Sequence, residues 1–415
     1  MIKPLPFTKP QIEKIIAEFP TPWHIYDEEG IRETARLIKQ ADEILPAGSR
    51  NFFAIKVLPN PHIMQILKEE GMGFDASSLP ELLLCERIGV RGEDIMFSSN
   101  ETPLKEYKKA HELGAIINID DITHIPFLKE HGIIPKIGCM RYNPGQAPVE
   151  LSHSYIIGNP ADAKFGVTKM QLLEGYQLLK DMGVKRFGIH TMLASNELNY
   201  KHFVAVANML FDLVIELSKE LQINFEFVNL GGGFGIPQKP GEKGLDLLAM
   251  AKEIRANYEK KIVGAGLPPL KIFTESGRMV TGPHGYLVST VLHQKHIYKE
   301  YVGLDASMAQ LMRPAIYKAY HHITILGKEN QPETQTYDMV GSLCENNDKF
   351  AIDRKLPKIE IGDIVVIHDT GAHGHAMGFN YNGKLRSAEI LLKEDGSVKL
   401  IRRAETPEDL FRTIA

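Results

Sequence analysis

Reactive residue types stand where short apolar segments of this chain end. Lys56 closes the segment NFFAIK beside aromatic residues. Apolar surroundings lower the pKa of an amine, which suits it to Schiff-base chemistry with a carbonyl group. Gly231, Gly232 and Gly233 follow the apolar segment FEFVNL, and the backbone N–H groups of a glycine run can surround a phosphate. A solvent-exposed lysine and a flexible turn are the ordinary alternatives.

Further polar residues close other apolar segments. In TESGR, Glu275 and Arg278 flank Gly277; a carboxylate here can keep a pyridine nitrogen protonated, and an arginine can bind a carboxylate. His190 ends RFGIH, where a neutral imidazole can stack on a cofactor ring, and Asp75 lies in MGFDASS. A surface ion pair and a buried structural histidine are the alternatives for these residues.

The elements that position these residues alternate in type. From about residue 50 to about residue 280, short β-branched apolar segments are separated by amphipathic stretches of helical period, which include Pro61–Glu70, Pro103–Leu113, Lys169–Met182 and Asn199–Leu221. The apolar segments are NFFAIKV, MGFDASS, DIMFSS, AIINID, PKIGCMRYN, RFGIHTM, FEFVNLGGG and LKIFTES. This α/β pattern predicts a closed (β/α)₈ barrel, similar to a TIM barrel, over residues 30–285, with an open doubly wound sheet as the alternative. In a barrel, the residues at the strand ends would gather at one rim.

After residue 285 the pattern changes to paired and alternating strands such as GYLVSTVLHQKHI, HHITIL, TYDMVG, DIVVIHD and AEILLKEDGSVKLIRR. We expect a mainly antiparallel β domain over residues 286–415, to which residues 1–29 contribute. Cys85 and Cys139 lie in apolar segments and are expected in the core, whereas Cys344 lies in a polar loop.

Composition limits the classes of partner. A net charge of −4 over 415 residues, without a dense Lys/Arg run, predicts neither a nucleic-acid partner nor a membrane partner. No signal peptide or spanning segment is visible, so a cytoplasmic protein is expected. His368, His373 and His375 lack a carboxylate or cysteine at ligand spacing, and no metal site is predicted. The expected partner is a small molecule or a second copy of the chain.

An amine, a phosphate cradle, an imidazole and a carboxylate together match the needs of pyridoxal 5'-phosphate. Along nearly its whole length the sequence resembles the fold-type III decarboxylases of alanine-racemase-like fold, and most closely the diaminopimelate decarboxylases. FAIK at 53–56 is similar to that family's cofactor-lysine strand, LGGGFGI at 230–236 to its phosphate loop, and ESGR at 275–278 to its pyridine-nitrogen and substrate motif.

The resemblance also implies roles after the predicted barrel. Arg313 and Tyr317, in RPAIY, resemble the family's substrate-binding arginine and tyrosine. Cys344 and Glu345, in SLCE, resemble the loop that a neighbouring subunit contributes, which implies a homodimer with shared active sites. Cys344 would then be the acid that protonates the α-carbon.

Three features depart from the family pattern, and one of them, Ser276 in place of a usual proline, is expected to have no consequence. The segment after His190 is longer than the family's, so the expectation that Ser195 binds the cofactor phosphate depends on the path of this segment. His373 stands where the family has a tyrosine that reaches cofactor and substrate. A histidine can still donate a hydrogen bond there, with a shift in phosphate affinity or substrate choice.

The implied activity is decarboxylation of meso-2,6-diaminopimelate to L-lysine and CO₂. The alternatives are a decarboxylase of another amino acid or diamino acid, an amino-acid racemase of the same fold, and a non-catalytic binding homologue. Such racemases place an arginine against the ring nitrogen and use a tyrosine as the second base, so Glu275 and Cys344 favour a decarboxylase.

Overall fold

The chain divides into two compact units, each with its own core. The computed structural model describes residues 3–146, 148 and 159–415. The barrel unit consists of Arg32–Ile236 and Gly244–Met279. The sheet unit consists of the described residues up to Ile31 together with Pro237–Lys243 and Val280–Ala415. The predicted fold class, a (β/α)₈ barrel with a separate β domain, is confirmed.

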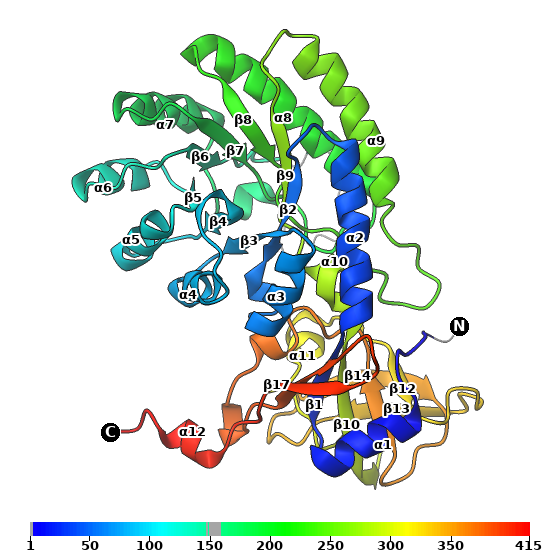
Figure 1. Cartoon of the computed structure of the whole chain (residues 1–415). Coiled ribbons are helices and arrows are strands. Elements are labelled where there is room, and N and C mark those ends of the chain that lie inside the picture. The colour runs from blue at the N-terminus through cyan, green and yellow to red at the C-terminus, as the bar shows by residue number, and fades with distance from the viewer. Residues whose placement is uncertain (1–2, 147, 149–158) are drawn as a thin grey trace. The chain divides into compact units, whose positions relative to one another are not determined.

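Eight parallel strands close the barrel, and the last of them pairs with the first (Figure 1). The strands are β2 (Arg50–Ala54), β3 (Gly73–Ala76), β4 (Ile95–Ser98), β5 (Ile116–Ile119), β6 (Gly138–Arg141), β7 (Phe187–His190), β8 (Phe225–Asn229) and β9 (Lys271–Thr274). Each predicted apolar segment of this region forms one of them. Strands buried on both faces read as continuous apolar runs, which is why these short segments were recognisable.

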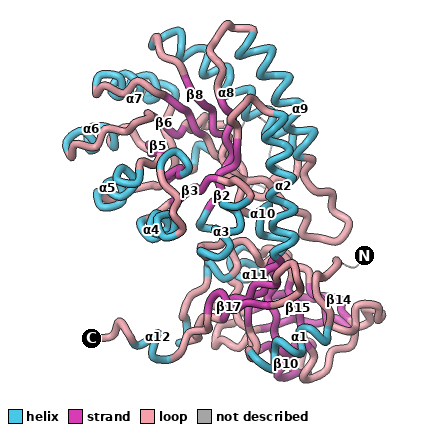
Figure 2. The backbone as a smooth tube through the Cα atoms, viewed as in Figure 1, coloured by secondary structure: helices cyan, strands magenta, loops and turns pink. Residues whose placement is uncertain are grey.

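Helices surround the barrel strands, as Figure 2 shows in cyan around magenta. The helices are α2 (Glu28–Ile44), α3 (Pro61–Glu69), α4 (Leu79–Arg87), α5 (Leu104–Leu113), α6 (His124–Glu130), α7 (Lys169–Asp181), α8 (Tyr200–Leu221), α9 (Leu247–Tyr258) and α10 (Arg278–Thr281). Local signals set several of their starts. Asn60 and Asn199 accept backbone N–H groups at the starts of α3 and α8, and Thr168 forms a capping box with Gln171 at α7.

The barrel interior is closely packed. One buried cluster consists of Phe52, Met96, Ile116, Ile137, Cys139, Phe227 and Phe273. A Cβ on Gly188 would lie 2.1 Å from the ring of Phe227, so β7 needs glycine at this position. Cys85 and Cys139 are buried as predicted, and Cys344 is exposed. A filled interior leaves the strand ends to carry polar chemistry.

The sheet unit contains a nine-stranded mixed sheet. Its main order is β14-β13-β11-β10-β1-β16-β17, and β15 pairs with both β10 and β12. The strands are β1 (Trp23–Asp27), β10 (Gly285–His296), β11 (Glu300–Leu304), β12 (Ile323–Ile325), β13 (Gln335–Val340), β14 (Lys349–Leu356), β15 (Ile364–Ile367), β16 (Ala388–Leu392) and β17 (Val398–Arg402). Its helices are α1 (Lys9–Glu18), α11 (Arg313–Tyr317) and α12 (Pro407–Phe411). Most pairs are antiparallel, but β1 pairs with β16 and β11 with β13 in parallel.

The described residues include neither a membrane-spanning helix nor a metal-binding cluster. None of the helices in this part of the chain has the length and apolar composition that a membrane crossing requires. Among the same residues, no three His, Cys, Asp or Glu side chains are grouped as ligands of a metal ion would be.

Candidate active site

Glu275, directly after β9, is the centre of a group of contacts at the carboxyl ends of the barrel strands. His190 ends β7, and its Nε2 lies 3.0 Å from Glu275 Oε2. Asn229 ends β8 and donates a hydrogen bond of 2.7 Å to Glu275 Oε1. Ser98, which ends β4, donates to the same oxygen at 3.4 Å. The strand ends therefore converge on one carboxylate, as the barrel predicts.

Two buried carboxyl groups of this rim titrate in opposite directions. Burial and the negative charge of Glu275 raise the pKa of Asp75 well above its usual range, although Lys56 opposes the shift. Burial also acts to raise the pKa of Glu275, but His190, Lys56 and Asn229 outweigh it, so that the pKa of Glu275 is lowered. The surroundings therefore favour the ionised form of Glu275 and the protonated form of Asp75.

Lys56 lies just beyond the end of β2, in the 3₁₀ turn Ile55–Val57. Ile55 and Val57 are buried, whereas the side chain of Lys56 is exposed. The expectation that apolar surroundings desolvate this amine is therefore wrong for the described structure. The chain turns after Ala54, so the neighbours of Lys56 enter the core and Lys56 does not. Its positive charge still acts on Asp75 and Glu275.

The glycine run after β8 passes close to other backbone segments. A Cβ on Gly231 would lie 2.4 Å from the carbonyl oxygen of Thr191, and one on Gly233 would lie 2.3 Å from that of Ala194. Both glycines also have left-handed φ angles, of 70° and 92°. A larger residue at either position would meet backbone atoms and an unfavourable φ, so the run requires glycine.

Replacing Gly232 with alanine is expected to weaken cofactor binding. The new Cβ would lie 2.3 Å from the carbonyl oxygen of Glu275, and relief of that overlap must displace either the glycine run or the Glu275 backbone. We expect a loss of about 1–3 kcal/mol in the free energy of unfolding, measured by denaturant unfolding, with weaker binding of pyridoxal 5'-phosphate in a spectroscopic titration.

Gly303→Ala is the matched control, because the nearest atom to its Cβ would be 3.5 Å away. Unchanged cofactor affinity in Gly232→Ala would show that the glycine run does not hold the phosphate.

Ser195 lies beside the glycine run in spite of the longer segment after His190. Gly235 donates its N–H to the carbonyl of Glu197 at 2.9 Å, and Glu197 donates its own N–H to the carbonyl of Gly233 at the same distance. Asn196 Oδ1 accepts the N–H of Ile236 at 3.1 Å. The half-buried Ser195 directly precedes these contacts, and the chain path is compatible with the predicted phosphate role.

The motif after β9 packs tightly against the turn that carries Lys56. A Cβ on Gly277 would lie 2.7 Å from Val57 Cγ1, so only glycine permits this approach. Asn51 stabilises the motif after β9, because its Oδ1 accepts the Ser276 N–H at 2.7 Å. Arg278 begins α10 and is buried.

Sequence reasoning gave no role to two of these positions. Asn51 supports the motif after β9, and Asn229 binds both Glu275 and, through Oδ1, the N–H of Gly231 at 2.9 Å. Each of them is a polar residue inside an apolar strand. Because a buried amide needs hydrogen-bond partners, this pattern could have indicated a supporting role.

Arg313 and Tyr317 lie at opposite ends of the short helix α11 in the sheet unit. Arg313 is buried, with 3% of its surface exposed, and burial lowers its pKa to about 10, which the negative charge of Asp369 opposes. Tyr317 is exposed. A buried guanidinium is costly without an anionic partner, which makes Arg313 suited to bind a carboxylate.

Cys344 and Glu345 lie in the loop between β13 and β14. Cys344 is exposed, and its backbone N–H donates to Asn382 Oδ1 at 2.8 Å. The buried Asp348 accepts the N–H of Leu343 at 2.8 Å. These two hydrogen bonds fix the backbone at Leu343 and Cys344, and the thiol remains exposed.

His373 is half-buried and follows β15. Its φ of 57° is left-handed, a conformation that is uncommon for residues other than glycine. The structure thus places the predicted site residues in two groups. One group lies at the barrel rim, and the other, with Arg313, Tyr317, Cys344, Glu345 and His373, lies in the sheet unit.

The barrel-rim residues fit pyridoxal 5'-phosphate. The ionised Glu275 can hold a proton on a pyridine nitrogen, and the glycine run offers a backbone cradle that a Cβ would fill. Within the described part of the chain, His190 Nδ1 and Asp75 Oδ1 are buried polar atoms without a hydrogen-bond partner. Such atoms at a site usually mark the place of a ligand or water.

Comparisons with known proteins agree with this fit. Residues 31–282 match the family model described as "Pyridoxal-dependent decarboxylase, pyridoxal binding domain". Protein TabA of Pseudomonas amygdali pv. tabaci is 44% identical over 96% of this chain and 92% of its own length. Diaminopimelate decarboxylase of Methanothermobacter thermautotrophicus is 32% identical over 95% of this chain and 92% of its own length.

Solved structures show the same relationship over the whole fold. The diaminopimelate decarboxylase of M. jannaschii in co-complex with L-lysine superposes with a TM-score of 0.86 at 29% identity, covering 97% of this chain and 94% of that one. The family model, the Methanothermobacter relative and the solved structure are all described as decarboxylases. The chain therefore belongs to the pyridoxal-dependent decarboxylases, and its cofactor is pyridoxal 5'-phosphate.

Proposed function

We propose that this enzyme decarboxylates meso-2,6-diaminopimelate, forming L-lysine and CO₂. The buried guanidinium of Arg313 carries the proposal, because diaminopimelate has a distal carboxylate that lysine and ornithine lack. One relative and one solved structure named above are diaminopimelate decarboxylases, and the latter holds L-lysine, the proposed product. These similarities support the substrate assignment.

In this proposal, positively and negatively charged side chains together bind the distal end of the substrate. Arg278 and Arg313 bind carboxylate groups, and Tyr317 donates a hydrogen bond. Glu345 binds the distal ammonium group, and His373 contributes a hydrogen bond to cofactor or substrate in place of the family's tyrosine. Such a set matches a zwitterionic side chain rather than a simple amine.

The barrel residues hold and tune the cofactor. Lys56 would hold it through its side-chain amine. Pyridoxal 5'-phosphate, when bound, supplies an electron sink for the carbon that loses CO₂. Glu275 keeps a proton on the ring nitrogen, which its lowered pKa permits at neutral pH. His190 covers the ring, and Gly231–Gly233 with Ser195 bind the phosphate. Asp75 is a further cofactor-binding residue, and the negative charge of Glu275 together with burial raises its pKa.

Cys344 is the acid that returns a proton to the α-carbon after CO₂ has left. Its thiol is exposed at the surface of the sheet unit, and a thiol can serve as a general acid. We further propose that a second copy of the chain provides this thiol, so that two sites are shared across a homodimer.

Shared sites predict complementation between two inactive variants. Lys56→Ala and Cys344→Ala should each be inactive alone, but a hybrid dimer regains one intact site of two. With equal mixing and free exchange, about half of the dimers are hybrids, so activity should reach about one quarter of that of the unmodified enzyme. This activity is measured as CO₂ release before and after subunit exchange.

Exchange must be verified separately, for example by native mass spectrometry of differently tagged chains. If hybrids form and activity remains absent, each site is made by one chain and the shared-site proposal is wrong.

The substrate assignment is tested by kcat/KM for CO₂ release from a panel of amino acids. We expect diaminopimelate to exceed lysine, ornithine and arginine by on the order of 100-fold or more, because substrates without the distal carboxylate leave a buried charge unpaired. Equal efficiency with lysine or ornithine would contradict the assignment while leaving the decarboxylase chemistry intact.

A second candidate is a decarboxylase for a related diamino acid. It is favoured by His373, which replaces the family's tyrosine at a cofactor- and substrate-contacting position, and by the 44% identity to protein TabA, whose name states no substrate. A panel substrate that keeps a distal carboxylate and exceeds diaminopimelate in kcat/KM would select this candidate.

A further inference from the structure

His321 lies directly beside the buried Arg313, although neither the family motifs nor the proposed reaction gives it a role. Helix α11 ends at Tyr317, and the chain reverses at the next residue, Lys318, whose φ of 51° is left-handed. Ala319 donates its N–H to the carbonyl of Arg313 at 3.3 Å. Two residues later the fully buried ring of His321 lies with Nε2 3.4 Å from Arg313 Nη1.

The two ring nitrogens of His321 have partners that define one protonation state. Nδ1 lies 2.8 Å from the carbonyl oxygen of His368, which can only accept, so Nδ1 must carry a hydrogen. Nε2 faces the guanidinium of Arg313, which can only donate, so Nε2 must present its lone pair. Only the neutral Nδ1–H tautomer satisfies both contacts.

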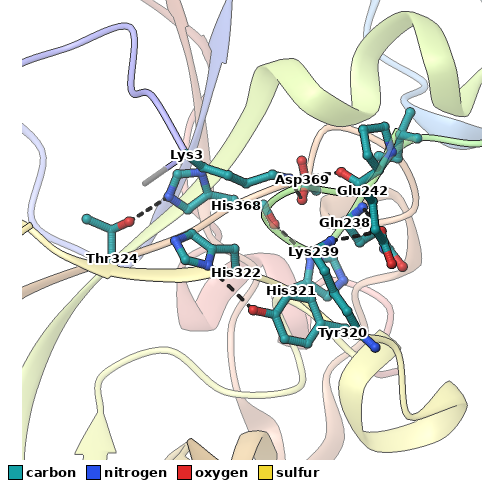
Figure 3. A network of polar contacts seen from close by, with 12 residues as sticks. Lys3, Gln238, Lys239, Glu242, Tyr320, His321, His322, Thr324, His368 and Asp369 are labelled. Atoms are coloured by element: carbon teal, nitrogen blue, oxygen red, sulfur yellow. Dashed lines mark hydrogen bonds and ion pairs between the residues drawn. The ribbon is translucent and has the colours of Figure 1, made fainter. Parts of the chain in front are cut away.

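The carbonyl that selects this tautomer belongs to a segment held by several hydrogen bonds of the sheet. His368 directly follows β15, and its backbone N–H donates to the carbonyl of His322 at 2.9 Å. Its Nε2 lies 2.8 Å from the Thr324 hydroxyl on β12 (Figure 3). Strand pairing between β12 and β15 thus holds the acceptor of His321 in place.

The charges around His321 oppose its protonation. Arg354 donates to its carbonyl oxygen at 3.0 Å, and Arg313 faces its ring. The carboxylate of Asp369 is itself bound by Lys3 at 2.5 Å (Figure 3). An imidazolium at His321 would therefore add a positive charge directly beside the buried guanidinium of Arg313.

We propose that His321 is a positioning residue for Arg313, with Nε2 accepting one guanidinium N–H so that the remaining N–H groups are held for a substrate carboxylate. The proposal rests on the proposed function, in which Arg313 binds the distal carboxylate. It adds a specificity-determining contact that does not itself touch the substrate.

Two substitutions test the hydrogen bonds of His321 Nδ1 and Nε2 separately. In His321→Asn the amide N–H₂ can replace Nδ1 against the His368 carbonyl, but nothing reaches Arg313. In His321→Gln the longer side chain can present its amide oxygen to Arg313. We expect His321→Asn to raise KM for diaminopimelate about tenfold with kcat nearly unchanged, the effect of one hydrogen bond to a charged group, and His321→Gln to recover most of the loss.

Lysine serves as the internal control, because it lacks the distal carboxylate and its slow turnover should be the same in all three proteins. The cofactor absorbance and the melting temperature should change little. A KM increase that is equal for both substrates, or equally poor diaminopimelate binding by both variants, would overturn the positioning role.

A second measurement needs neither variant to be active. In the unmodified holoenzyme labelled with ¹⁵N-histidine, the His321 resonances, assigned by their loss in His321→Asn, should show a protonated Nδ1 and an unprotonated Nε2 at neutral pH. An imidazolium or an Nε2–H tautomer would refute the proposal whichever substrate the enzyme prefers. Conversely, failure of the diaminopimelate preference with the predicted tautomer present would refute the proposed function alone.

Discussion

Replacement of Lys56 by alanine is expected to abolish both the visible absorbance of lysine-bound cofactor and all measurable CO₂ release. Lys56 is the amine whose charge reaches Glu275 and Asp75 at the barrel rim, and an alanine side chain cannot form the covalent link that holds the cofactor. The purified variant is measured by its spectrum after incubation with pyridoxal 5'-phosphate and by a CO₂ assay.

Lys108→Ala provides the matched control, because Lys108 is exposed on α5 and a substitution at the surface should change stability by less than about 0.5 kcal/mol. Borohydride reduction of the unmodified holoenzyme, followed by peptide mapping, identifies the labelled residue. A label on any lysine other than Lys56 would show that the cofactor site is assigned wrongly.

Replacement of Arg313 by alanine is expected to remove most of the preference for diaminopimelate. Loss of a buried cationic partner for the distal carboxylate should cost about 3 kcal/mol or more in transition-state binding, which corresponds to a fall in kcat/KM of on the order of 100-fold or more. Turnover of lysine should change little, and the cofactor spectrum should be preserved. Steady-state kinetics with both substrates measure the ratio.

Arg313→Lys tests the guanidinium itself, since a lysine keeps the charge but not the two-pronged geometry; we expect an intermediate loss. Arg87→Ala, at an exposed position of α4, should leave both substrates unaffected. If Arg313→Ala lowers kcat/KM for lysine as much as for diaminopimelate, Arg313 does not bind the distal carboxylate.

The barrel was predictable from the sequence because each of its strands is buried on both faces. Segments such as FGIH at 187–190 and FEFVN at 225–229 are short apolar runs bounded by polar breaks, and their order alone defines neighbours in a parallel barrel. The same logic placed His190 and Glu275 at one rim, where they lie 3.0 Å apart.

The sheet unit was less accessible to this reasoning. Its parallel pairs β1·β16 and β11·β13 join segments far apart in the chain, and local hydrophobic pattern does not reveal which strands pair. The exposure of Lys56 was missed for a related reason: the chain leaves strand geometry after Ala54, and the alternation of a strand no longer predicts which side chain is buried.

Hydrogen bonds that hold the site residues in place could not be predicted from the sequence either. Asn51 and Asn229 are polar residues within apolar strands, which signals a buried hydrogen bond but not its partner. The pairing of His321 with Arg313 depends on the chain reversal at Lys318, where a left-handed lysine gives no signal in the sequence. Such contacts require the backbone path as well as the residue types.

The central claim is tested most directly by following meso-2,6-diaminopimelate through one reaction in D₂O. With the holoenzyme, mass spectrometry and CO₂ analysis should find L-lysine with one non-exchangeable deuterium at the decarboxylated carbon, and one CO₂ for each lysine formed. That result requires loss of the carboxylate followed by delivery of a solvent-derived proton. Deuterium incorporation into diaminopimelate without CO₂ release, or an unreacted substrate with a cofactor-loaded enzyme, would contradict the account.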